Sequence, residues 1–247
     1  MAKIVNSLKR ALDLLELFAR ERRPLSVREI STHLDAPVSS SVDIIHTLVS
    51  KAYLAPGKDR RTVFPTGKLY HLGQQLVFDG AFELIAAGLD DLNAETDETC
   101  MLTHYADGRL HVVAVRESSQ RLRYIVGVGE RIGLHVTAAG KCVLAGLDEA
   151  DRRAALAELK FVQATAQSHL EPESLLADIE RGRGRGWQES VGEAYDGLMS
   201  IAVPVKIHGL DYAVTIVGPI ERIRPGRKAH AQRLLALRAS VEPVAVG

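Results

Sequence analysis

The chain has only two cysteines, Cys100 and Cys142, and they do not form a C-x-x-C pair. A disulfide framework or a structural zinc site is therefore not expected. It also lacks a signal-peptide pattern at its start and any apolar run near the roughly 18 residues needed to cross a bilayer. We accordingly expect a cytoplasmic protein. The sequence shows no internal repeat at a fixed period.

The chain has no net charge, which taken alone argues against a nucleic-acid binder. The charges are unevenly distributed, however. Residues 1–64 carry 11 basic and 7 acidic residues, and the remainder carries 20 basic and 24 acidic ones. A length of 247 residues is comfortable for two domains. A basic N-terminal segment followed by a more acidic remainder is typical of a small DNA-binding domain attached to a second domain.

Residues 26–51 have the pattern of two short helices joined tightly. Ser26 and Glu29 form an S-x-x-E capping box, which marks a helix start, and Pro37 marks the end of that helix. A second helix is predicted over residues 38–51, with Val42, Ile45, Leu48 and Val49 at helical spacing. Its other face is polar and includes Ser50. The side chains of this face that could reach DNA are Ser39, Ser40, Asp43, His46 and Thr47.

A hairpin with a basic tip is predicted next, over residues 53–64. The turn at residues 56–61 carries Lys58, Arg60 and Arg61. Two helices followed by such a wing are typical of proteins whose second helix enters the major groove while the wing lies on phosphates. This pattern predicts a winged helix-turn-helix and favours transcriptional regulation.

The other elements are predicted from periodicity. Asn6 or Ser7 is expected to cap a first helix that carries Leu8, Ala11, Leu12, Leu15 and Phe18 on one side, and a linker helix follows the wing. Strands are predicted over residues 100–105, 110–115, 123–128, 199–206 and 212–217, and helices over residues 135–147, 148–159, 173–184 and 225–239. The last residues, 241–247, are expected to fray. Strands in runs with helices packed on them indicate an α+β second domain.

Four separated motifs resemble the IclR family of bacterial regulators. The family's opening pattern S-x-x-R-A-L-x-L-L-x-x-F is similar to residues 7–18, and its L-x-x-L-x-x-K-G-Y-L is similar to residues 45–54. Its L-H-x-T-A-x-G-K-x-L-L-A segment closely resembles residues 134–145. Its segment from R-G-Y/W to I-A-x-P-V, and a final G-P, resemble residues 185–205 and 218–219.

The resemblance implies a winged helix-turn-helix (residues 1–66), a linker helix (67–88) and a GAF/PAS-like α/β effector-binding domain (89–247). It implies a homodimer or dimer of dimers that binds a double-stranded DNA operator and responds to a small metabolite, often an organic or aromatic acid. No cofactor or metal is implied. Residues aligned with the family's ligand pocket are Ala138, Ala139, Ser190, Ser200, Thr215 and Val217.

Two positions depart from the family pattern. Asp43 stands where an arginine is expected in the recognition helix, and an acid accepts from cytosine N4 but repels phosphate. Altered specificity, an outward-facing Asp43 and lost DNA binding all remain open. In the pocket, Ser200 and Thr215 can donate to an anion, whereas Val217 replaces a commonly polar position and suggests a more apolar ligand.

Several other residues could have either a structural role or a role in ligand or metal binding. Residues 137–141 open a helix after a strand, and such an N-terminus favours a carboxylate. Glu193 is interpreted as a carboxylate that caps backbone groups rather than a ligand contact, and Trp187 as a core residue. Scattered candidates for a metal site match no compact ligand pattern: His104, His111, His135, Cys142 and Glu193.

The leading hypothesis is a transcriptional regulator, and specifically a repressor. Two other functions are alternatives to it. An enzyme could use Cys142 or Ser200 as a nucleophile, but no sequence pattern places a base and an orienting acid beside either. Alternatively, the chain could be a sensor with weakened or lost DNA recognition, which Asp43 would explain. The sequence favours the ligand-responsive regulator.

Overall fold

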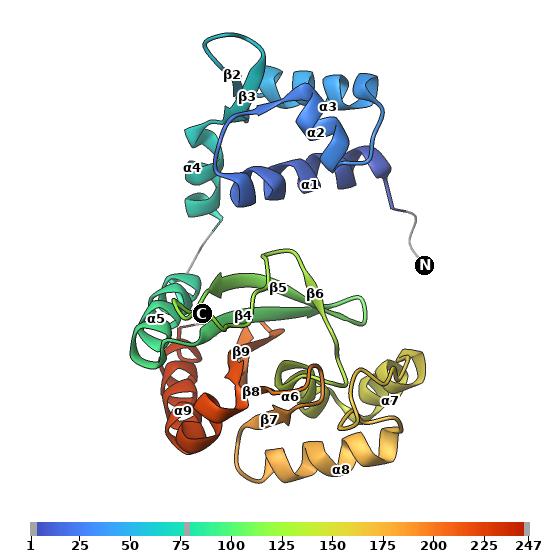
Figure 1. The fold of residues 1–247 in the computed structure, drawn as a ribbon, viewed down its shortest axis with the longest axis vertical. Helices are drawn as coiled ribbons and strands as arrows, with labels where there is room; N and C mark the ends of the chain where they lie inside the picture. Colours follow the sequence, from blue (N-terminus) through green and yellow to red (C-terminus); the bar gives the residue numbers. More distant parts are fainter. Residues whose placement is uncertain (1–3, 77–79, 245–247) are drawn as a thin grey trace. The chain divides into compact units, whose positions relative to one another are not determined.

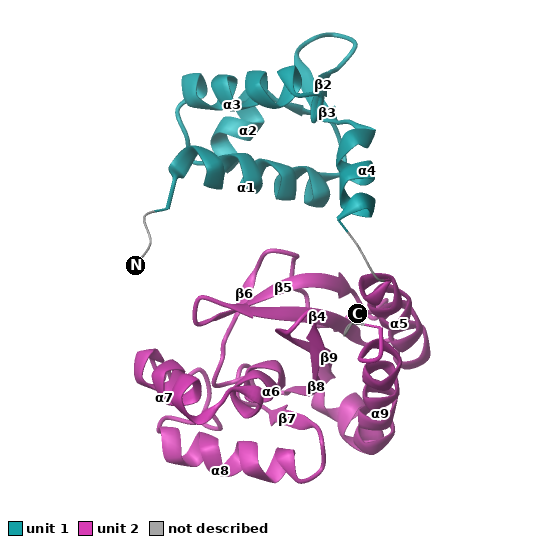
Figure 2. Cartoon of the chain, turned by 180° about the vertical axis from the view of Figure 1, so that it is seen from behind, with its two compact units in different colours: residues 1–78 teal, residues 79–247 magenta. Residues whose placement is uncertain are grey.

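The computed structural model describes residues 4–76 and 80–244. The chain forms two compact units, residues 1–78 and 79–247 (Figure 2). Within the described residues, no helix combines the length and the apolar character needed to span a membrane. The predicted linker helix of residues 67–88 is instead two helices, α4 (Gly67–Gln75) and α5 (Ala81–Thr96), and the division between the units falls between them.

Unit 1 contains the predicted winged helix-turn-helix. Helix α1 (Asn6–Glu21) packs behind α2 (Val27–His33) and α3 (Val38–Ser50). The hairpin of β2 (Leu54–Pro56) and β3 (Thr62–Pro65) is joined by the short strand β1 (Leu25–Ser26), in the order β1-β3-β2. The predicted capping box is confirmed, because the Ser26 hydroxyl accepts from the Glu29 N–H and the Glu29 carboxylate accepts from the Ser26 N–H.

The buried face of α1 differs from the predicted one. Leu14, Leu17 and Phe18 are buried, whereas Leu8 and Leu12 are 60% and 53% exposed. The residue preceding α1 is Val5, and no side chain caps the helix, so neither Asn6 nor Ser7 has the predicted role. Periodicity locates the helix correctly. Two sets of apolar residues at helical spacing overlap in it, however, and the spacing alone favours the larger set.

Helix α3 also buries a face slightly rotated from the predicted one. Ile44 and Ile45 are buried as part of the core, but Val42 is 44% exposed and Ser41 is fully buried. Ser41 tolerates burial because its hydroxyl donates to the Pro37 carbonyl at 3.3 Å. This local hydrogen bond replaces water and lets a polar residue take the inward position.

Unit 2 is built on a six-stranded antiparallel sheet in the order β6-β5-β4-β9-β8-β7 (Figure 1). Helices α5 and α9 cover one face, while α6 and α8 lie on the other. The strands are β4 (Thr99–Ala106), β5 (Arg109–Arg116), β6 (Arg131–Ile132), β7 (Gln188–Val191), β8 (Leu198–Ile207) and β9 (Leu210–Pro219). The helices are α6 (Ala138–Gly146), α7 (Glu149–Glu158), α8 (Pro172–Arg183) and α9 (Ile220–Val241).

Alternation along β8 and β9 separates a core face from a cavity face. Ile201, Val203, Val214 and Ile216 pack with α5 and α9 in the larger core. The residues between them therefore point to the face of the sheet that α6 covers. That face carries Ser200, Ala202, Ala213, Thr215 and Val217.

Several predicted elements of unit 2 need correction. The predicted strand at residues 123–128 is neither helix nor strand, and the edge strand is the shorter β6. The apolar pattern of this segment is misleading because two of its apolar residues, Ile125 and Val128, are exposed. Strand β7 was not predicted. Helix α6 begins at Ala138 rather than at 135, and α9 begins at Ile220 rather than at Pro225.

The prediction for the chain end is also wrong in part. Residues 241–247 were expected to fray, but Val241 is buried and is the last residue of α9. Residues 245–247 lie outside the described part of the chain.

Candidate functional site

One face of α3 is an exposed polar surface. Ser39, Asp43, His46 and Thr47 are exposed, while Ile44 and Ile45 hold the opposite face in the core. Ser40 is half-buried and its hydroxyl accepts from Arg10 at 3.3 Å. Five of the side chains predicted to reach DNA therefore lie on one helix, four of them fully available at the surface.

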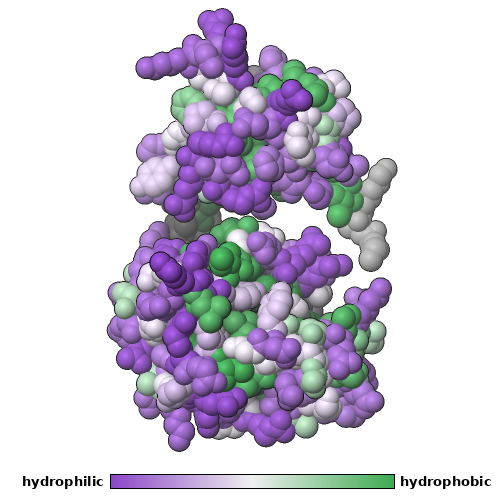
Figure 3. Space-filling view, viewed as in Figure 1, coloured by the Kyte–Doolittle hydropathy of each residue, from purple (hydrophilic) through white to green (hydrophobic). Residues whose placement is uncertain are grey.

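The tip of the hairpin between β2 and β3 carries three exposed cations, Lys58, Arg60 and Arg61. Within the described part of the chain none of them forms an ion pair. The Asp59 carboxylate accepts from the Arg61 backbone N–H at 3.0 Å and so shapes the turn. The tip projects from unit 1, and its surface is strongly hydrophilic (Figures 1 and 3).

Unit 2 contains a small inner chamber of about 20 Å³ on the cavity face of the sheet, beside Thr137, the residue that caps α6. Four of the six predicted ligand residues line it, namely Ser190, Ser200, Thr215 and Val217. Sequence analysis missed seven more: Met101, Tyr124, Ile132, Val136, Thr137, Ala194 and Leu198.

The two remaining predicted ligand residues, Ala138 and Ala139, are not among those that line the chamber. Both are fully buried and pack in the core between α6 and α8. The Ala138 N–H instead donates to the Ser200 hydroxyl at 3.3 Å, so this residue positions a lining side chain.

The chamber's hydroxyl groups differ in how well they are satisfied. Ser190 donates to the Val136 carbonyl at 2.8 Å. Thr215 is fully buried, and its Oγ1 has no hydrogen-bond partner among the described residues. A buried polar group without a partner is uncommon in folded proteins and calls for an explanation.

A larger outer cleft of about 510 Å³ adjoins the chamber. The two share part of their lining, and the cleft adds three charged side chains, Glu130, Arg131 and Asp196. The exposed residues Ile125 and Tyr195 also border it. The shared residues are Tyr124, Ile132, Val136, Thr137 and Ala194.

A buried charge cluster lies beside the chamber. Lys141 of α6 is fully buried, and its ammonium contacts Asp178 of α8 and the Glu193 carboxylate, the latter at 2.6 Å. It also donates to the Glu189 carbonyl of β7 at 3.0 Å. Glu193 Oε1 accepts from the Val191 N–H at 3.3 Å. The carboxylate therefore binds a backbone group, as predicted, and also pairs with Lys141.

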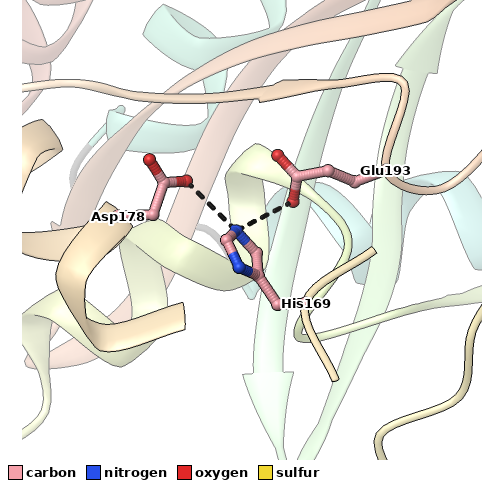
Figure 4. A group of neighbouring side chains, drawn as sticks. All are labelled: His169, Asp178 and Glu193. Atoms are coloured by element: carbon pink, nitrogen blue, oxygen red, sulfur yellow. Dashed lines mark ion pairs between the residues drawn. The ribbon is translucent and has the colours of Figure 1, made fainter. Parts of the chain in front are cut away.

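His169 lies against the same two carboxylates, with its Nε2 3.5 Å from Asp178 and 3.7 Å from Glu193 (Figure 4). Ligand atoms of these three residues lie within 4.8 Å of one another, a spacing that could hold a metal ion. Lys141 already compensates both carboxylates, however, so an ion there would sit beside a buried ammonium group. We therefore interpret His169, Asp178 and Glu193 as part of an internal ion-pair network rather than as a metal site.

The pKa values of nearby groups follow from burial and charge. Burial alone would raise the pKa of the Asp178 carboxyl, but the hydrogen bond and charge of Lys141, with Arg181, lower it below its usual value. Burial raises the pKa of Tyr124 to about 12. It also raises the pKa of the Cys142 thiol, which is therefore not activated as a nucleophile.

Trp187 is a core residue, as predicted from the sequence. Its indole packs with the core beneath α9, and the Arg185 guanidinium lies 3.8 Å from the ring centroid. As the only tryptophan of the chain, it reports on the folding of unit 2.

Comparisons with known proteins cover both units. Residues 7–56 match the family described as IclR helix-turn-helix domain, and residues 81–245 match the family described as Bacterial transcriptional regulator IclR C-terminal. The Pca regulon regulatory protein of Pseudomonas putida is 28% identical over 203 residues, which cover 81% of this chain and 69% of that protein.

Solved structures show the same fold. An IclR transcriptional regulator from Alicyclobacillus acidocaldarius is 23% identical, with a TM-score of 0.77 over 98% of this chain and 100% of that one. An IclR homologue from Microbacterium hydrocarbonoxydans in complex with 4-hydroxybenzoate is 18% identical, with a TM-score of 0.74 over 97% of this chain and 99% of that one.

Replacing Lys141 by Met should lower the free energy of unfolding of unit 2 by about 3–5 kcal/mol, because two buried carboxylates lose their counter-charge. Urea denaturation followed by Trp187 fluorescence measures this. The difference should shrink as the pH falls. Lys141 lowers the pKa of Asp178 in the wild type, so without this counter-charge Asp178 takes up a proton at a higher pH and no longer leaves an unpaired buried charge.

Lys160→Met is the matched control, since Lys160 is exposed and forms no ion pair with a described residue. It should change stability by less than about 0.5 kcal/mol. Equal losses in the two variants would show that the buried cluster does not stabilise the fold.

Proposed function

Because the chain belongs to the IclR family of bacterial transcriptional regulators, we propose that it represses its target genes and releases the operator when a small organic acid binds unit 2. Helix α3 enters the major groove in this proposal, and the wing between β2 and β3 lies on the flanking phosphates. The DNA contacts would come from Ser39, Ser40, Asp43, His46, Thr47, Lys58, Arg60 and Arg61.

One observation carries the DNA-binding part of the proposal. Helix α3 exposes polar side chains beside Val38 and Val42, and the three cations of the wing have no ion pairs within the described residues. Unpaired cations on a projecting turn are what phosphate contacts need. The wing would supply affinity without sequence preference, and α3 would supply the base contacts.

The effector part rests on the chamber and the outer cleft of unit 2. Ser190, Ser200, Thr215 and Val217 would contact the ligand, and Ala138 would act by holding Ser200. The structure of the Microbacterium hydrocarbonoxydans homologue contains 4-hydroxybenzoate, which supports an aromatic acid as one candidate class.

A homodimer or a dimer of dimers is proposed as the DNA-binding form. A two-fold dimer presents two α3 helices to a near-palindromic operator, and a protein bound there excludes polymerase without further contacts. The effector acts only if it binds the released form more tightly than the DNA-bound form.

A second candidate function follows from Asp43. This acid is exposed on the α3 face, where it would repel phosphate. A sensor protein with weakened DNA recognition is therefore the alternative. A gel-shift assay of the full chain against its own upstream DNA separates the two functions. Salt-sensitive binding that an effector relieves supports the repressor, and no binding at low salt supports the sensor.

Changing Lys58, Arg60 and Arg61 together to Ala should weaken binding to every DNA sequence alike. The slope of log affinity against log salt should fall by about one unit for each phosphate that the variant no longer touches. Fluorescence anisotropy over a salt series measures both effects. The control changes three exposed cations of unit 2, Arg224, Arg227 and Lys228, and should leave the slope nearly unchanged. A changed sequence preference in the wing variant would contradict this placement.

Changing Asp43 to Arg should strengthen binding to non-specific DNA, because a repelled carboxylate becomes a phosphate or guanine contact. Glu16→Arg makes the same charge change at an exposed position of α1 and controls for net charge. Anisotropy with a random-sequence duplex compares the two. If both variants bind like the wild type, Asp43 faces solvent in the complex.

A further inference from the structure

We propose that the effector enters the inner chamber with an uncharged oxygen first, a hydroxyl or a carbonyl, which Thr215 and Ser200 receive. Any acid group of the effector then lies in the outer cleft beside Arg131. This inference rests on the proposed effector role of unit 2 and specifies the chemical class and orientation of its ligand.

The unsatisfied hydroxyl of Thr215 is the first observation. Thr215 is one of the residues that line the chamber, and its Oγ1 is fully buried and has no hydrogen-bond partner among the described residues. The neighbouring strand shows the contrast, since the equally buried Thr103 donates to the Ala213 carbonyl at 3.3 Å. The Thr215 hydroxyl is therefore buried without a hydrogen-bond partner, and a ligand oxygen could provide that partner.

Ser200 provides a second hydroxyl on the adjacent strand. Its Oγ accepts from the Ala138 N–H, which leaves its own hydrogen for a ligand oxygen. The register pairs Ser200 with Val217 and Ala202 with Thr215, so the two hydroxyls belong to neighbouring positions of β8 and β9. Together they offer a donor and an acceptor, which suits an uncharged oxygen.

The N-terminus of α6 offers little to an anion in this chain. The Ala138 N–H is used by Ser200, and the Gly140 N–H is used by the Thr137 hydroxyl. The Lys141 N–H donates to the Thr137 carbonyl. Among the described residues, only the Ala139 N–H of this first turn has no partner. A carboxylate at this helix end would therefore meet one free backbone donor unless it displaced the other bonds.

The chamber is also electrically neutral. Every residue that lines it is uncharged, including Tyr124, whose pKa is raised to about 12 by burial. Moving a carboxylate from water into such a space costs far more than moving a hydroxyl or carbonyl group. An uncharged oxygen therefore satisfies Thr215 without an uncompensated buried charge.

The size of the chamber limits what enters it. A volume of about 20 Å³ holds one small group, comparable to a single water molecule. The rest of the ligand must lie in the outer cleft of about 510 Å³, which shares Ile132 and Val136 with the chamber. These apolar side chains suit a ring or short hydrocarbon between the two polar ends.

Arg131 is the cation of the outer cleft. It is exposed and forms no ion pair within the described residues. Glu130 lines the same cleft, but its Oε1 accepts from the Gly127 N–H at 2.9 Å. The third charge, Asp196, keeps the cleft from being generally positive. An acid group would therefore be bound locally by Arg131 rather than by a general positive field.

The first test needs no ligand. Thr215→Val removes the unsatisfied hydroxyl and keeps the shape, so the melting temperature of the full chain should stay equal or rise. Thr103→Val removes a satisfied hydroxyl and should lower it. Differential scanning calorimetry compares them. If Thr215→Val lowers the melting temperature as much as Thr103→Val does, the hydroxyl has a partner and the proposal fails.

The second test uses two acid pairs that differ by one hydroxyl, benzoate with 4-hydroxybenzoate and phenylacetate with 4-hydroxyphenylacetate. In calorimetric titrations the wild type should bind the hydroxylated member about two- to tenfold more tightly. Thr215→Val should abolish this preference, and Arg131→Ala should weaken both members equally. A preference unchanged in Thr215→Val, or weaker binding of benzoate in that variant, would show that the acid group enters first.

Failure of the proposed function gives a different result. If none of the four probes binds, the effector is not an acid of these types and that part of the proposed function is wrong. The ligand-free comparison of Thr215→Val with Thr103→Val then decides the present proposal alone.

Discussion

The buried ammonium of Lys141 is the interaction on which the ligand site depends. It joins α6, α8, β7 and the segment after β7 at one point, because its partners are Asp178, Glu189 and Glu193. Removing one member of a buried ion pair leaves an uncompensated charge, which is far more costly than losing a surface pair. The cluster fixes the position of α6 over the sheet, and hence that of Val136 and Thr137, which line the chamber just before this helix.

The same cluster reaches the wall of the chamber through the chain itself. Glu193 precedes Ala194, which lines both the chamber and the outer cleft. Two further bonds hold this segment, since Thr165 donates to the Gly192 carbonyl at 2.6 Å and Ser168 donates to the Glu193 carbonyl at 2.8 Å. Charge and hydrogen bonds therefore keep an otherwise irregular segment in one conformation, which is a condition for selective binding.

The sequence predicted local features well and long-range ones poorly. The capping box at Ser26, the break at Pro37 and the basic wing are encoded by neighbouring residues, and unit 1 was correctly predicted from them. The partners of Lys141 are 37 and 52 residues away, so no spacing rule could pair them. Four lining residues were found by family resemblance, whereas Met101 and Tyr124 come from segments without a motif.

The unsatisfied hydroxyl of Thr215 gives the chamber a means of selecting between ligands. Strand alternation forces its side chain to the cavity face, where β4 and β8 leave its hydroxyl without a partner. A valine there would avoid this cost, as Val217 does two residues later. A ligand shifts an equilibrium only by binding one state better than another. Because the hydroxyl is unsatisfied without a ligand, an oxygen placed beside it stabilises the occupied chamber selectively, whereas an apolar group of equal size gains no such advantage.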